Sequence, residues 1–228
     1  MCENYVILVK EISSRDDAAM RQIKNNAAGS AAFFDLSYEE DLKMTKKIVF
    51  IVGSLRKGSF NRQLADAVKE LIGDRALVDF LDYADIPFMN QDIQFPAPEA
   101  VARVRREIQA ADGIWIFTPE YNHQIPGVLK NLLDWLSRPL EEGKFGSGTA
   151  VSGKAVTVSG AGGKLATAEC RAHLDTLLTF MRMRVMKEGE TGVSLPVDAF
   201  QTGKFEVSGE VKEQLSAQAD AFLEFIGQ

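Results

Sequence analysis

The sequence predicts an α/β fold: a parallel sheet of five strands, in the order 2-1-3-4-5, with helices packed on both faces. Short runs rich in Val, Ile and Phe alternate along the chain with longer segments whose apolar residues recur at helical spacing. Loops that contain glycine follow several of these apolar runs. Strands that alternate with helices form parallel sheets covered on both sides, and right-handed crossovers between them favour the stated order.

The expected elements begin near residue 46 and continue to the end of the chain, so residues 45–228 are taken as one domain. The strands are expected at 47–52, 76–81, 113–118, 154–159 and 184–186. The helices are expected at 63–72, 99–111, 128–136, 166–181 and 210–226. Trp115 and Trp135 are assigned to core packing. Arg103, Arg105 and Arg106 are assigned to the solvated face of their helix.

An anion site is expected in the loop that joins the first strand to its helix. Residues 53–62 read Gly-Ser-Leu-Arg-Lys-Gly-Ser-Phe-Asn-Arg, and no acidic residue occurs from Lys46 to Ala65. A loop of this kind directs backbone N–H groups and the positive end of a helix dipole at one place. The residues expected to bind a phosphate there are Ser54, Arg56, Lys57, Gly58, Ser59, Phe60 and Asn61. A plain strand-to-helix turn capped by Ser59 or Asn61 is the alternative.

The same loop excludes three common classes of phosphate-binding protein. A P-loop needs Lys directly after its second Gly, whereas Ser59 follows Gly58 here. A dinucleotide fingerprint needs Gly two residues after its first Gly, where this chain has Leu55. A phospho-receiver domain needs acidic residues at the end of the first strand, which here ends in Gly53-Ser54. A monophosphate bound by hydroxyl groups without a metal fits better.

Two further loops are expected at the same edge of the sheet. The loop after the third strand, 119–122, reads Pro-Glu-Tyr-Asn, and Tyr121 offers a flat surface to a planar ring. The fourth strand ends at Ser159, and the glycines at 160–163 permit close approach of the backbone to a ligand, although a flexible turn explains them almost as well. Loops at the carboxyl ends of parallel strands gather at one edge. Together the three loops predict a pocket for a phosphorylated flat heterocycle.

These motifs resemble the NADPH-dependent FMN reductase family, which includes bacterial quinone, chromate and azo-compound reductases on a flavodoxin-like fold, a three-layer sandwich. The similarity covers about residues 46–228, and it rests on residues 53–61, 118–122 and 126–138. It implies that the FMN phosphate is bound by Ser54, Arg56, Ser59 and Asn61. It implies that the isoalloxazine ring lies against Pro119, Glu120, Tyr121 and Asn122, with Ser159, Gly162 and Gly163 near its edge. The segments 141–153 and 163–173 are longer than the family pattern.

The resemblance implies an enzyme that passes hydride from NADPH or NADH to bound FMN and then, in a ping-pong cycle, to a quinone, azo compound, chromate or flavin. No catalytic side chain is expected, because the protein would orient the reactants and stabilise charge on the ring. His123 is taken as a rim residue, and Glu120 as either a ring contact or a turn cap. Two alternatives stay open: a flavodoxin-type electron carrier, and a non-enzymatic flavin-binding sensor.

Composition limits the partners and the compartment. The net charge of −6 and the lack of a basic tract argue against nucleic acid. No run of 18 apolar residues occurs, so no membrane span is expected. Two cysteines and two histidines support neither a disulfide framework nor a metal site, and without a signal peptide they indicate a cytoplasmic protein. The partner is a small-molecule electron acceptor, and the resemblance implies a homodimer or homotetramer.

Residues 1–44 do not follow the strand-and-helix pattern. They contain one short apolar run, at 5–9, and otherwise no clear period. They are interpreted either as an N-terminal extension that is partly disordered or as the product of a start assigned too early, since Met44 directly precedes the first core strand. In both cases we expect catalysis to need only residues 45–228.

Overall fold

The computed structural model describes residues 45–207 and 209–228, and the proposed N-terminal extension lies outside the described residues. Its sheet has the order β2-β1-β3-β4-β5, with every neighbouring pair parallel. The expected strand order and the flavodoxin-like topology are therefore confirmed. Among the described residues, no helix has both the length and the apolar character needed to cross a membrane.

The elements lie close to their expected positions. The strands are β1 (Lys47–Val52), β2 (Leu77–Phe80), β3 (Gly113–Phe117), β4 (Ala155–Gly162), β5 (Arg184–Val185) and β6 (Gly192–Ser194). The α-helices are α4 (Phe60–Ile72), α5 (Glu99–Gln109), α6 (Gly127–Leu136), α7 (Ala168–Phe180), α8 (Val197–Thr202) and α9 (Gly209–Gly227), and short 3₁₀ turns are η1 (Gly73–Arg75) and η2 (Gln91–Ile93).

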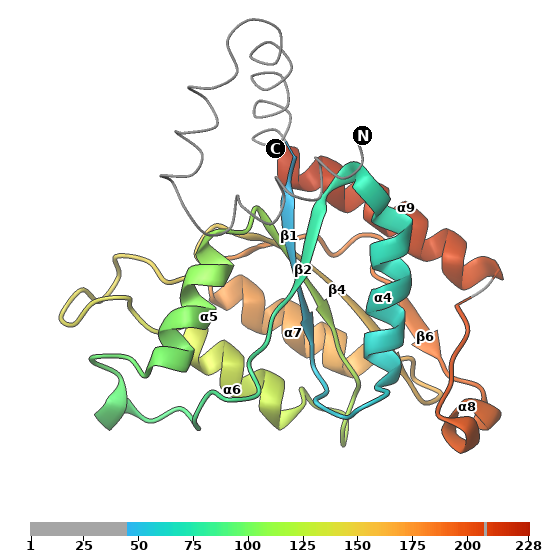
Figure 1. The fold of residues 1–228 in the computed structure, drawn as a ribbon, viewed down its shortest axis with the longest axis horizontal. Helices are drawn as coiled ribbons and strands as arrows, with labels where there is room; N and C mark the ends of the chain where they lie inside the picture. Colours follow the sequence, from blue (N-terminus) through green and yellow to red (C-terminus); the bar gives the residue numbers. More distant parts are fainter. Residues whose placement is uncertain (1–44, 208) are drawn as a thin grey trace, which may run out of the picture. The chain divides into compact units, whose positions relative to one another are not determined.

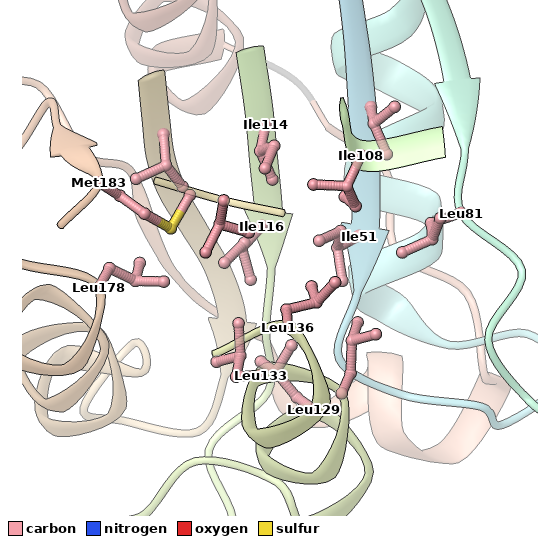
Figure 2. Packing of buried hydrophobic residues seen from close by; sticks show 14 of the residues in the cluster. Ile51, Leu81, Ile108, Ile114, Ile116, Leu129, Leu133, Leu136, Leu178 and Met183 are labelled. Atoms are coloured by element: carbon pink, nitrogen blue, oxygen red, sulfur yellow. The ribbon is translucent and has the colours of Figure 1, made fainter. Parts of the chain in front are cut away.

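The sheet is covered on both faces, which makes three layers (Figure 1). On one face, α5, α6 and α7 pack through apolar residues such as Ile108, Leu133 and Leu178, which Figure 2 shows against the strands. On the other face, α4 and α9 pack through residues such as Leu64 and Phe222. Alternate residues of β1 therefore enter opposite cores, which explains why its sequence is apolar throughout.

The strands run downward in Figure 1, so the loops at their carboxyl ends lie at the lower edge of the sheet. β1 lies between β2 and β3, and the chain crosses from one side of β1 to the other after β2. The strand order thus reverses between β1 and β3, which is where ligands bind in open α/β sheets. The loops that follow β1 and β3 flank this point.

Three details differ from the sequence-based expectations. A sixth short strand, β6, pairs with β4 beyond the end of β5, and α8 forms in a segment with no clear helical period. Arg105 is also not on the solvated face of α5. Its side chain is buried, and its Nη2 donates to the carbonyl of Trp135 at 3.1 Å. The expected core positions of Trp115 and Trp135 are confirmed.

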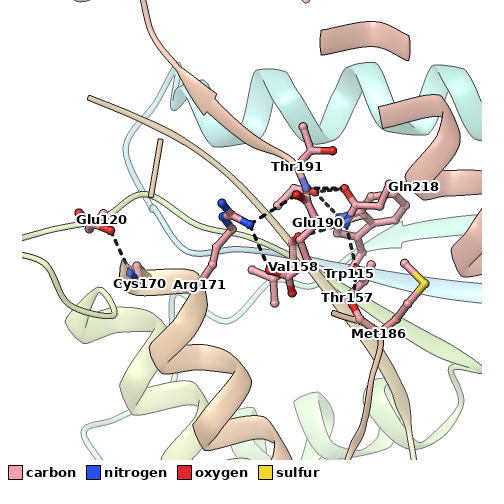
Figure 3. A network of polar contacts seen from close by, with 11 residues as sticks. Trp115, Glu120, Thr157, Val158, Cys170, Arg171, Met186, Glu190, Thr191 and Gln218 are labelled. Atoms are coloured by element: carbon pink, nitrogen blue, oxygen red, sulfur yellow. Dashed lines mark hydrogen bonds and ion pairs between the residues drawn. The ribbon is translucent and has the colours of Figure 1, made fainter. Parts of the chain in front are cut away.

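A buried amide joins α9 to the sheet. Gln218 is 1% exposed, and its Oε1 accepts hydrogen bonds from Ser159 Oγ at 2.9 Å and from the Thr191 backbone N–H at 3.0 Å. Its Nε2 donates to Thr157 Oγ1 at 2.9 Å and to the Val158 carbonyl at 3.0 Å (Figure 3). A side-chain amide has two donor hydrogens and two acceptor lone pairs, so every one of them is used.

Replacing this amide by an apolar side chain is expected to destabilise the fold. Gln218→Leu would leave the four buried groups that the amide contacts, on Thr157, Val158, Ser159 and Thr191, without these hydrogen bonds. We expect a loss of about 3 kcal/mol in the free energy of unfolding. Urea denaturation measures this loss. Gln214→Leu on the exposed side of the same helix is the control, and it should change the free energy by less than about 0.5 kcal/mol. Equal effects of the two substitutions would contradict the assignment.

A second buried polar group, Glu190, lies in the turn before β6. Its side chain is 6% exposed, and its Oε2 lies 3.2 Å from Nη1 of Arg171 on α7 (Figure 3). Burial, together with the negative charge of Asp175, raises the pKa of Glu190 to about 8. Glu190 Oε1 and Asp175 Oδ1 are both buried acceptors without a donor, and a proton on Glu190 would join them. The positive charge of Arg171 lowers the pKa of Glu190, but not enough to offset the effect of burial.

This raised pKa makes the stability of the fold depend on pH. Between about pH 4.5 and 8, Glu190 is protonated in the folded chain and ionised in the unfolded chain. The free energy of unfolding should therefore fall as pH rises through this window. Glu190→Gln imitates the protonated form and should match the wild type at pH 5 and exceed it by about 2–4 kcal/mol at pH 9. Denaturation at several pH values tests this, with the exposed Glu188→Gln as control. Parallel pH profiles for wild type and Glu190→Gln would refute it.

Candidate functional site

A cavity of about 340 Å³ opens at the carboxyl edge of the sheet, where the strand order reverses. Ten residues singled out in the sequence line it: Ser54, Arg56, Ser59, Phe60, Asn61, Pro119, Glu120, Tyr121, Gly162 and Gly163. They come from the loops after β1 and β3 and from the end of β4. The expectation that these three segments meet in one cavity is therefore correct.

The loop after β1 presents hydrogen-bond donors to this cavity. Ser59 is 2% exposed and is the N-cap residue of α4, yet its side chain makes no capping hydrogen bond. The guanidinium of Arg56 lies over the Phe60 ring, 5.0 Å from its centroid, and makes one long contact of 3.4 Å to the Lys57 carbonyl. The first N–H groups of α4 have no acceptor within the helix, and the helix dipole adds positive potential. These groups fit a phosphate monoester.

Asn61 holds this loop against the end of the sheet. Its Nδ2 donates to the Ala161 carbonyl at 3.0 Å, and its Oδ1 accepts from the Ala161 N–H at 2.8 Å. Both contacts are buried, and they link positions 100 residues apart in the sequence. Asn61 thus lines the cavity, but one donor and one acceptor of its amide are used to join α4 to β4. Its principal role in the structure is to position the loop.

The loop after β3 forms a tight turn. The backbone N–H groups of Tyr121 and Gln124 donate to each other's carbonyl groups, at 3.3 and 3.0 Å. The two residues between them, Asn122 and His123, have positive φ angles of 53° and 62°. Non-glycine residues adopt such angles rarely, and pairs of them are typical of type I′ turns. The turn leaves Tyr121 at the rim of the cavity with 53% of its surface exposed.

Glu120 anchors this turn to α7. Its Oε2 accepts the backbone N–H of Cys170 in the first turn of α7 at 2.9 Å, which Figure 3 shows. His123 Nδ1 lies 3.2 Å from Glu169 Oε2 and 3.7 Å from Glu120 Oε1. Glu120 therefore caps the N-terminus of α7, not its own turn, which was one of its two expected roles. The other expected role, a contact with the ring, stays a prediction. Glu120 also lines the cavity.

The end of β4 lines the cavity with small residues, Ala161 and Gly162, followed by Gly163. A Cβ atom added to Gly160 would lie 2.5 Å from the Thr118 carbonyl oxygen and 2.1 Å from Thr167 Oγ1. A Cβ on Gly162 would lie 2.9 Å from Thr167 Cγ2. Glycine is therefore required where β4 passes the loop after β3 and the start of α7. Gly163 has open space beside it and borders the cavity directly.

Four of the residues singled out in the sequence do not line this cavity. Lys57 and Gly58 face a second cavity, on the side of the loop that borders β2. Asn122 lies at the exposed tip of the turn. Ser159 is fully buried, and its hydroxyl accepts from Trp115 Nε1 at 3.0 Å and donates to Gln218. The Ser159 side chain thus belongs to the polar network of the core.

Sequence reasoning missed the wall formed by Leu195, Phe200 and Gly203, which belong to α8 and its flanks. Phe200 packs edge-to-face on Phe60, with ring centroids 5.6 Å apart. Gln63 joins this wall to the first loop, because its Nε2 donates to the carbonyls of both Gly58 and Gly203. Phe200 and Gly203 belong to no recognisable motif, so no signal in the sequence indicated this wall.

Two further features of the described residues bear on the chemistry at this edge. No group of three or more His, Cys, Asp or Glu residues within residues 45–207 and 209–228 is arranged to hold a metal ion. Cys170 is buried beside Thr118, and burial raises the pKa of its thiol to about 11. The thiol is therefore protonated at neutral pH and is a poor nucleophile.

Comparisons with known proteins agree with this geometry. Residues 46–196 match the model of the family described as NADPH-dependent FMN reductase. The chain is 33% identical over 184 residues to a 2-hydroxy-1,4-benzoquinone reductase from Burkholderia sp., covering 80% of this chain and 97% of that protein. It is 37% identical over 187 residues to a quinone reductase of Escherichia coli K12, covering 79% and 95%.

A solved structure leads to the same assignment. The flavoenzyme NAD(P)H:(acceptor) oxidoreductase from Paracoccus denitrificans is similar, with a TM-score of 0.70 and 30% sequence identity. The alignment covers 80% of this chain and 98% of that one. The family match spans the three loops that line the cavity. This chain belongs to the NADPH-dependent FMN reductase family.

Proposed function

We propose that the protein is an NAD(P)H-dependent quinone reductase that binds FMN in the cavity at the carboxyl edge of its sheet. The observation that carries the proposal is the meeting of three loops, 54–61, 119–121 and 162–163, around one cavity. Membership of the family supports FMN as cofactor and NAD(P)H as reductant. The names of two relatives support quinones as acceptors.

The phosphate of FMN would be held by the first loop. Ser54, Arg56 and Ser59 line the cavity there, and the N-terminus of α4 adds backbone donors. Lys57 is left out of this set because it faces the second cavity. The ring would lie between the turn at Tyr121 and the bare backbone at Gly162 and Gly163. A planar ring fits such a wall because no Cβ atom projects from it.

Bound FMN supplies the hydride acceptor and donor chemistry of the reaction. The chain's own residues bind and orient the reactants, and they hold the wall of the site rigid. In the turn 119–124, the N–H groups of Tyr121 and Gln124 are used by the turn itself. Charge on the ring would therefore be stabilised by the remaining N–H groups of this loop rather than by these two. The open rim at Tyr121 would admit acceptors of several shapes, including azo compounds, chromate and free flavin.

We propose a ping-pong cycle, because NAD(P)H and the acceptor would use the same open face of the cavity in turn. We also propose a cytoplasmic homodimer or homotetramer, as the resemblance in sequence implies. Light scattering after size-exclusion chromatography measures the assembly, and initial-rate kinetics with parallel lines in double-reciprocal plots would identify the cycle.

The first test is an anaerobic titration of the FMN-loaded protein with NADPH and, separately, with NADH. A reductase should lose the visible flavin absorbance in one two-electron step and regain it when a quinone is added. A flavodoxin-type carrier would bind FMN but would not respond to either nucleotide. Protein that binds no FMN would refute the assignment of the cavity.

The variant Ser59→Ala should weaken FMN binding about tenfold or more, because the hydrogen bond from the buried Ser59 hydroxyl to the FMN phosphate would be lost. Quenching of flavin fluorescence measures this affinity.

A second test separates the enzyme from a flavin-binding sensor. A chain that lacks residues 1–43 should keep its FMN affinity and its quinone reductase rate within about twofold, since the family match begins at residue 46. Steady-state kinetics of the full-length and shortened proteins measure this. Loss of turnover in a shortened protein that still folds and binds FMN would contradict the proposed division of the chain.

A further inference from the structure

A second cavity shares the first loop as a wall. It has a volume of about 470 Å³ and is lined by residues 54–58, by Arg62 of α4 and by residues 80–83 at the carboxyl end of β2. Ser54 and Arg56 line both cavities, so a single short stretch of chain separates them. The site proposed for FMN does not use this second cavity.

The charges around this cavity favour an anion. Arg56, Lys57 and Arg62 contribute three positive side chains, all of them exposed to solvent. Asp82 is the acidic residue of the lining, and its Oδ1 accepts the N–H of Ala84 at 3.3 Å. Arg62 Nε also contacts Asp66 on the same helix at 3.0 Å, in an exposed pair that contributes little to stability. With Asp66 and Asp82 both counted, the balance of these five groups is still positive.

Arg62 is positioned for planar and anionic groups. Its Cζ lies 3.6 Å from the centroid of the Phe80 ring, which places the guanidinium over the ring face. About half of the Arg62 side chain remains exposed. A guanidinium held in this way can bind a phosphate through two N–H groups and can stack on a flat heterocycle.

The floor beneath these side chains is rigid. Tyr83 is buried, and its hydroxyl donates to the Val52 carbonyl at 2.6 Å. The Leu81 N–H donates to the Phe50 carbonyl at 2.9 Å, which continues the pairing of β2 with β1. The floor of the cavity is therefore a fixed part of the sheet edge, below the cationic side chains.

We propose that this second cavity binds the adenosine 2′-phosphate end of NADPH, with Lys57 and Arg62 as the residues that favour NADPH over NADH. This proposal rests on the proposed reductase function. The reactive end of the co-substrate must reach the first cavity, and the adjoining second cavity is a site for its distant end. A phosphate monoester is a dianion at neutral pH and matches the excess of cations, whereas the 2′-hydroxyl of NADH carries no charge.

The test uses the FMN-loaded, full-length protein and the variants Lys57→Gln, Arg62→Gln and their combination. Lys212→Gln, which removes an exposed positive charge from α9, is the matched control. Binding of adenosine 2′,5′-bisphosphate and of adenosine 5′-monophosphate is measured by calorimetry. KM is measured for NADPH and NADH with a quinone as acceptor, and Kd is measured for FMN.

The wild type and the control should bind the bisphosphate at least about tenfold more tightly than the monophosphate. The combined variant should lose this difference and raise KM for NADPH about tenfold, with KM for NADH and Kd for FMN changed by less than about twofold. Equal KM changes for both nucleotides, or none, would overturn the proposal while leaving the reductase function intact. Failure of both nucleotides to reduce wild-type protein would instead remove the function on which the proposal rests.

Discussion

The paired hydrogen bonds between the Asn61 amide and the Ala161 backbone hold the site together. They connect the start of α4 to the end of β4 across β1 and β3, at the point where the strand order reverses. Because both bonds are buried, breaking them would leave two backbone groups of β4 without partners, which is costly. The loop is therefore pre-organised before any ligand arrives.

The other two segments of the site are held by comparable means. The turn after β3 is attached to α7 by the bond between Glu120 and the Cys170 N–H. The wall at α8 is attached to the first loop by Gln63. In each case one polar side chain spans two segments that are distant in sequence. The rigid sheet sets the approximate position of each loop, and these side chains set its final geometry.

The strand order, most of the elements and most of the cavity lining could be predicted from the sequence, because long apolar runs, helical periods and turn residues are local signals. β6 and α8 could not be predicted. Gly192–Ser194 contains a single β-branched apolar residue, and α8 is six residues long, so neither carries a period. The burial of Arg105 also escaped prediction, since it depends on a carbonyl of α6 that only tertiary packing brings near. The division of Arg56, Lys57 and Arg62 between two cavities depends on the direction of side chains in a loop and could not be read from spacing.

The shared position of Arg56 has a thermodynamic consequence. A phosphate bound in the first cavity would offset part of the positive potential that Arg56 contributes to the second. The two anions would therefore oppose each other's binding, and by linkage each would lower the affinity of the other by the same factor. Such antagonism would weaken nucleotide binding while FMN is in place, and so would favour release of the nucleotide. A single arginine between two anion sites would thus help the enzyme to exchange its co-substrate while it retains its cofactor.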